Sequence, residues 1–81
     1  MKSIDQVLIE LTPIFRDALD DERLILKTNM SARNVEGWDS FTHMQLIAAI
    51  ERHYGINFRL KELLNFQDVG DMCRAVLRLT Q

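Results

Sequence analysis

Hydrophobic side chains recur every three or four residues in three stretches of the chain. In the first stretch, residues 4–20, the apolar positions are Ile4, Val7, Leu8, Leu11, Ile14, Phe15 and Leu19. This spacing is typical of an amphipathic helix, and Ser3 precedes it as a suitable N-cap. Pro13 has no backbone N–H to donate, so we expect a kink or a new first turn at that position.

The second stretch runs from Ser40 to Tyr54 and carries two apolar stripes. Its inner stripe consists of His43, Leu46, Ile47, Ile50 and Tyr54. Phe41, Met44 and Ala48 fall on nearly the opposite side, also at spacings of three and four. One helix cannot bury both stripes in one core, so we predict that the second stripe is an exposed docking surface. Gly55 is well suited to end this helix.

The remaining segments complete an all-helical pattern. A short turn is expected over residues 60–64, and a last helix that begins near residue 67 or 68 buries Val69, Met72, Cys73 and Val76. Residues 21–38 lose the periodicity, so we expect this long connection to be held down by Leu24, Leu26, Met30 and Val35. No segment alternates with a period of two. The pattern predicts one all-α domain over residues 1–81, a small four-helix bundle with three longer helices and one short one.

Composition and charge exclude several classes of protein. The chain has 81 residues, of which 47% are hydrophobic and 27% charged, as in ordinary globular domains. A net charge of −2 without a basic stripe argues against a nucleic-acid partner. The longest apolar run, residues 46–50, is too short to cross a bilayer. A single cysteine cannot form an internal disulfide, and two histidines make a closed zinc site improbable, so we expect no metal. A lone thiol is safe in the cytoplasm, where we expect the protein to act as a monomer.

The pair Asp39-Ser40 is the strongest candidate for chemistry. Asp39 is a preferred N-cap residue, and capping alone would explain it. A phosphate ester on Ser40 would also be stabilised by the positive end of the helix dipole. A serine hydrolase using Ser40, His43 and Asp39 is disfavoured, because Asp39 is poorly placed to orient His43 and no Gly-x-Ser-x-Gly elbow is present. A domain of this size also has little room for an enclosed active site, so we expect no catalysis.

In its length and order of elements, the chain resembles the acyl carrier proteins. Residues 37–41, Gly-Trp-Asp-Ser-Phe, stand where that family has its Asp-Ser-Leu motif, with Phe41 replacing the leucine. Residues 46–51 and 54–58 look like the family's second helix and the loop after it. The resemblance covers nearly the whole chain. It implies an acyl-carrier-type fold.

The resemblance also implies roles for individual residues. Ser40 would receive 4′-phosphopantetheine from coenzyme A through a magnesium-dependent phosphopantetheinyl transferase, which Asp39 would help to position. The thiol of this arm would carry an acyl group as a thioester. Partner enzymes would dock on Trp38, Phe41, Thr42, Met44, Gln45 and Ala48. The candidate contacts with the arm or its cargo are His43, Leu46, Ile50, Phe58 and Leu63.

The chain departs from the fatty-acid carriers in its charges. Thr42 and Gln45 stand where acids are common in that family, and Glu51 is offset by Arg52. Weak steering by charge points to a specialised pathway, with a loading ligase and downstream transferases or synthases as partners. Two alternatives remain open from the sequence. One is an aminoacyl or peptidyl carrier loaded by an adenylating ligase, and the other is an unmodified helical interaction module.

Overall fold

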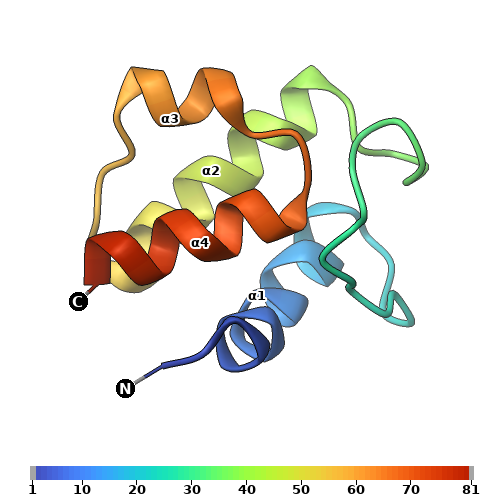
Figure 1. Ribbon diagram of the computed structural model, residues 1–81. Coiled ribbons are helices and arrows are strands. Elements are labelled where there is room, and N and C mark those ends of the chain that lie inside the picture. The colour runs from blue at the N-terminus through green and yellow to red at the C-terminus, as the bar shows by residue number, and fades with distance from the viewer. Residues whose placement is uncertain (1, 81) are drawn as a thin grey trace.

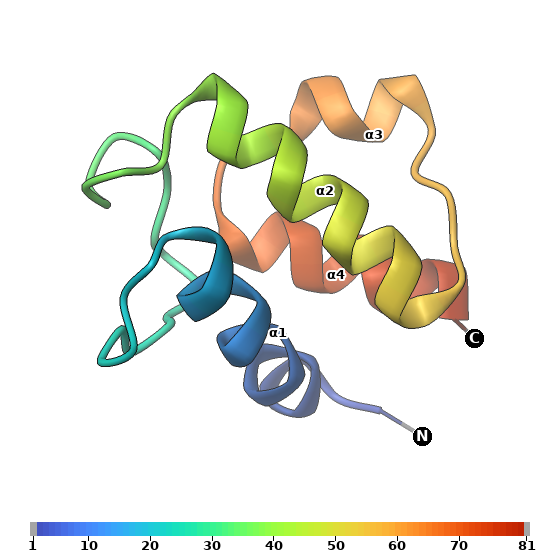
Figure 2. The same cartoon turned by 180° about the vertical axis from the view of Figure 1, so that it is seen from behind.

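The computed structural model describes residues 2–80, and within them all the regular structure is helical. Four helices follow in order: α1 (Ile4–Ala18), α2 (Ser40–Tyr54), α3 (Leu60–Asn65) and α4 (Val69–Thr80). Helix α1 packs against both α2 and α4. In both views α3 lies on the opposite side of α2 and α4 from α1 (Figures 1 and 2). The predicted bundle of three longer helices and one short helix is confirmed.

Helix α1 is continuous through Pro13. Ser3 caps it, since its hydroxyl accepts a hydrogen bond from the Gln6 N–H at 3.2 Å. In the residue immediately before Pro13, the Thr12 hydroxyl donates to the Leu8 carbonyl at 2.8 Å. The expectation of a new first turn at Pro13 is therefore wrong. The surrounding helix tolerates the loss of one hydrogen bond because the apolar face of α1 is anchored in the core.

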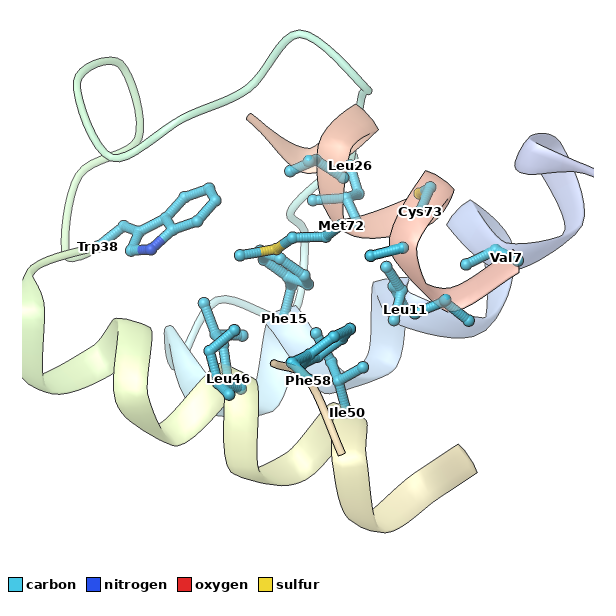
Figure 3. Packing of buried hydrophobic residues seen from close by; sticks show 14 residues of the cluster. Val7, Leu11, Phe15, Leu26, Trp38, Leu46, Ile50, Phe58, Met72 and Cys73 are labelled. Atoms are coloured by element: carbon cyan, nitrogen blue, oxygen red, sulfur yellow. The ribbon is translucent and has the colours of Figure 1, made fainter. Parts of the chain in front are cut away.

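The core draws on every part of the chain that the periodicity selected (Figure 3). Its buried members are Val7, Leu11 and Phe15 of α1, Leu46, Ile47 and Ile50 of α2, and Val69, Met72, Cys73, Ala75 and Val76 of α4, together with Leu26, Trp38 and Phe58 from the connections. Ten side chains in this set are less than 2% exposed. Burial of this kind stabilises the fold by about 1.5–3 kcal/mol for each large side chain.

The long connection between α1 and α2 is fixed at several points. Leu26 is buried, and Leu24, Met30 and Val35 pack against the core, as predicted. The Arg16 side chain donates to the Leu24 carbonyl at 2.8 Å. The start of α4 also binds this connection. The Val69 N–H donates to the Met30 carbonyl at 2.9 Å. The connection therefore delivers the chain to the start of α2 in a defined position.

Candidate functional site

Ser40 is the first residue of α2 and its side chain is exposed. The preceding residue, Asp39, caps the helix, and its carboxylate accepts a hydrogen bond from the Thr42 N–H at 2.9 Å. The Asp39 backbone carbonyl also accepts from the His43 N–H at 2.8 Å. These bonds close the first turn around Ser40. The serine hydroxyl is thus presented to solvent from a rigid backbone.

The electrostatics at this helix start suit an attached phosphodiester. Hydrogen bonds from the Thr42 backbone N–H and then from the Thr42 side chain hold the pKa of Asp39 below its ordinary value, so the carboxylate is ionised at neutral pH. The first turn within α2 contains no acidic residue. A phosphate on Ser40 would meet the positive end of the helix dipole, which it would share with the Asp39 carboxylate that caps the helix, and the residues present fit such a group.

Trp38 and His43 form a polar contact that brackets Ser40. The Trp38 indole N–H donates to His43 Nδ1 at 3.1 Å, and the two rings lie 17° from parallel with their centroids 6.1 Å apart. Trp38 also packs edge-on against Phe15, at a centroid distance of 5.3 Å. With Asp39 as N-cap, Trp38 and His43 occupy the N′ and N4 positions that form a hydrophobic staple in many helices. Sequence reasoning missed this pair, although the spacing of five residues across an N-cap was the signal for it.

The geometry does not assemble a hydrolase. Nδ1 of His43 accepts from Trp38, and the Asp39 carboxylate accepts from Thr42. Burial lowers the pKa of His43, so the imidazole is neutral at pH 7 and its remaining hydrogen lies on Nε2. In a catalytic triad the acid would instead hold the histidine by its Nδ1–H. The arrangement of Asp39 and His43 is that of a capped and stapled helix start.

The six residues predicted for partner docking differ in their exposure to solvent. Phe41 and Met44 are 73% and 61% exposed, and Gln45 and Ala48 are also exposed. Trp38 is only 5% exposed, because its ring packs in the core against Phe15, and it offers little surface to a docked partner (Figure 3). Thr42 is 8% exposed and likewise offers a docked partner little surface.

The residues proposed to contact the arm or cargo lie in or beside the core. Leu46 and Ile50 are completely buried, and Phe58 packs edge-on against Phe66 with ring centroids 5.2 Å apart. His43 and Leu63 are half-buried. Inner and outer faces of α2 therefore separate as the periodicity predicted, with Ser40 beside both.

A fixed helical scaffold that presents one serine at a capped helix start is the arrangement of a carrier domain, and the comparisons with known proteins place it in a family. Residues 10–76 match the family described as PP-binding, phosphopantetheine attachment site. The chain belongs to this family and is an acyl carrier protein. It is a non-catalytic carrier, and its cofactor is 4′-phosphopantetheine. Its partners are a phosphopantetheinyl transferase and biosynthetic enzymes in general.

Two solved structures resemble the chain closely. The holo acyl carrier protein from Geobacter metallireducens is 43% identical, with a TM-score of 0.84, and the match covers 89% of this chain and 83% of that one. A putative acyl carrier protein from Mycobacterium tuberculosis is 21% identical, with a TM-score of 0.79 and coverage of 94% and 97%, and shows the shared fold. No curated protein sequence matches the chain.

Among residues 2–80, no helix has the length and apolar character needed to span a membrane.

Proposed function

We propose that Ser40 carries the 4′-phosphopantetheine arm and that the protein serves enzymes of a specialised biosynthetic pathway. The observation that carries the first part is the exposed Ser40 hydroxyl on the first residue of a capped helix. When attached, the arm supplies a thiol on which an acyl group is held as a thioester. Ser40 anchors it, and the ionised Asp39 carboxylate beside it helps to position the transferase.

The docking surface we propose consists of Phe41, Met44, Gln45 and Ala48, which we call the outer stripe. All four side chains are exposed, and none is charged. Helix α2 has a single acid, Glu51, and its carboxylate accepts a hydrogen bond from the Phe58 N–H at 2.8 Å. Glu51 thus organises the loop after α2. An outer stripe without acids favours partners that recognise apolar shape and hydrogen bonds over partners that present basic patches.

The same stripe supports the choice of a specialised pathway. Carriers that rely on charge gain association rate from long-range attraction, whereas this surface offers little such steering. Partner enzymes would therefore recognise it at short range, with Phe41 and Met44 as apolar anchors. The effect of the tether is to raise the effective concentration of the cargo near each docked enzyme.

Intact-protein mass spectrometry tests the attachment. Wild-type protein is incubated with coenzyme A, magnesium and a broad-specificity phosphopantetheinyl transferase, beside Ser40→Ala and the control Ser31→Ala. We expect one added phosphopantetheine in the wild type and in Ser31→Ala, and none in Ser40→Ala. Modification that persists in Ser40→Ala would move the attachment site elsewhere. If the wild type also stays unmodified with a cognate transferase, the domain is an unmodified interaction module.

A further inference from the structure

The tautomer of His43 is fixed by the contact that staples the start of α2. Trp38 donates its indole N–H to Nδ1 of His43 at 3.1 Å, so Nδ1 must be the unprotonated nitrogen. The hydrogen of the neutral ring then lies on Nε2, on the other edge of the imidazole. Trp38 is itself immobilised, since it is 5% exposed and packed edge-on against Phe15. The buried Trp38 thus fixes which edge of the half-buried His43 ring carries the N–H donor.

This donor lies beside the position where the arm begins. His43 follows Ser40 by three residues, so the two side chains are neighbours on the surface of α2. Long side chains in a helix lean toward its N-terminus, which carries the imidazole over the turn that starts at Ser40. The ring is half-buried, and its Nδ1 edge is already satisfied. The Nε2–H edge is therefore the part of His43 that can serve another molecule.

We propose that the Nε2–H of His43 donates a hydrogen bond to the phosphodiester attached at Ser40, and that Trp38 is the positioning residue that holds His43 in this tautomer. The inference rests on the attachment of the arm to Ser40. It gives the arm a defined direction at its root, because one phosphate oxygen would be held on the side of α2 that faces the core. The opposite side, with Phe41 and Met44, stays free for partners.

The charges around His43 make a titration informative. Burial is the cause that lowers the pKa of His43. The charged group nearest to it along the chain is the Asp39 carboxylate, which is bound to Thr42, while Trp38 contributes an uncharged donor. A phosphodiester anion in contact with the imidazole would be a new charge, and opposite charges at hydrogen-bonding distance favour the protonated ring.

NMR of the apo and holo proteins tests the proposal, with mass spectrometry to establish that Ser40 is modified. We expect the pKa of His43 to rise by roughly 1 unit on modification. The ring resonances of His53, which lies at the other end of the same helix and is exposed, are the internal control for chemical shifts and should be the same in apo and holo protein. In the apo protein the nitrogen shifts of His43 should show the Nε2–H tautomer, and Trp38→Phe should weaken that preference and the response to modification.

Two variants of His43 distinguish a hydrogen bond to the phosphate from a purely electrostatic effect of the phosphate charge on the imidazole. His43→Gln retains an acceptor for Trp38 and a donor for the phosphate, whereas His43→Phe retains neither. We expect the phosphorus resonance of holo His43→Gln to match that of the wild type and the resonance of holo His43→Phe to shift. Heteronuclear spectra of both apo variants verify the fold. An unchanged His43 pKa in modified protein, or the same phosphorus resonance in His43→Phe as in the wild type, would overturn the proposal while leaving the attachment to Ser40 intact. Absence of modification at Ser40 would overturn both.

Discussion

Helix α2 presents apolar side chains on two faces, and the two faces have different physical explanations. On the inner face Leu46, Ile47 and Ile50 are at most 3% exposed and belong to the shared core. On the outer stripe Phe41 and Met44 remain 73% and 61% exposed. The residues of the inner face are hydrophobic because burying their apolar area stabilises the fold. Folding does not account for the second group, and our proposal assigns it to contact with a partner.

The largest effect that separates the two faces is expected at Ile50. This side chain is completely buried, so Ile50→Ala removes its apolar contacts and leaves a cavity. We expect a loss of about 2–5 kcal/mol in the free energy of unfolding. Denaturant titration measures it, with Met44→Ala as the matched truncation on the outer stripe, for which the change should stay within about 0.5 kcal/mol. Equal losses in the two variants would mean that the faces do not differ in burial.

A smaller effect is expected where the inner face meets α1. The Tyr54 hydroxyl donates to Glu10 at 2.6 Å, and Lys2 donates to both oxygens of the same carboxylate at 2.8 and 3.0 Å. Tyr54→Phe removes one charge-assisted hydrogen bond and keeps the ring. We expect it to lower the free energy of unfolding by about 1–2 kcal/mol. If the variant unfolds at the wild-type midpoint, the bond between α1 and α2 contributes nothing net.

The same contact predicts a dependence of stability on pH. The hydrogen bonds from Lys2 and then Tyr54 lower the pKa of Glu10 from its ordinary value of 4.5. The stabilisation from the ionised carboxylate is therefore complete above about pH 5 and is lost as the pH falls through the lower folded-state pKa. Unfolding of wild type and Glu10→Gln between pH 7 and 3 should show a difference that shrinks on acidification. A difference that grows in acid would contradict the sign of this shift.

Most of the fold could be predicted from the sequence because the helices are strongly patterned. The spacing of Val7, Leu11 and Phe15 selected the buried face of α1, and that of Leu46 and Ile50 selected the buried face of α2. A helical period determines which face a side chain occupies, and the core then selects the apolar face. Ser40 could be selected as the candidate attachment residue for a related reason, because the Asp39 cap marks where the helix begins.

Three positions differ from the simple sequence pattern, each for its own reason. Trp38 precedes α2, so the direction of its side chain is set by the loop and by Phe15, neither of which can be read from spacing. Thr42 lies four residues before Leu46 in α2, so the helical period places it beside the buried face, where it is 8% exposed. Pro13 shows the opposite case, since packing of α1 in the core outweighed a local signal for interruption. Long-range contacts thus decide the outcome at Trp38 and at Pro13.

The smallest change in stability, and the sharpest test of the outer stripe, is expected from Met44→Glu. The side chain is exposed on α2 and buries little area, so the free energy of unfolding should change by no more than about 0.5 kcal/mol. A carboxylate in the stripe would nevertheless be desolvated in any apolar contact, and productive transfer of cargo to a partner enzyme should fall several-fold. Ile25→Glu is the matched control, because Ile25 is 68% exposed but lies in the connection between α1 and α2. Steady-state transfer rates and binding to a cognate partner should decline only for Met44→Glu. Equal effects of both variants would show that the partner responds to net charge, and the outer stripe would then lose its special role.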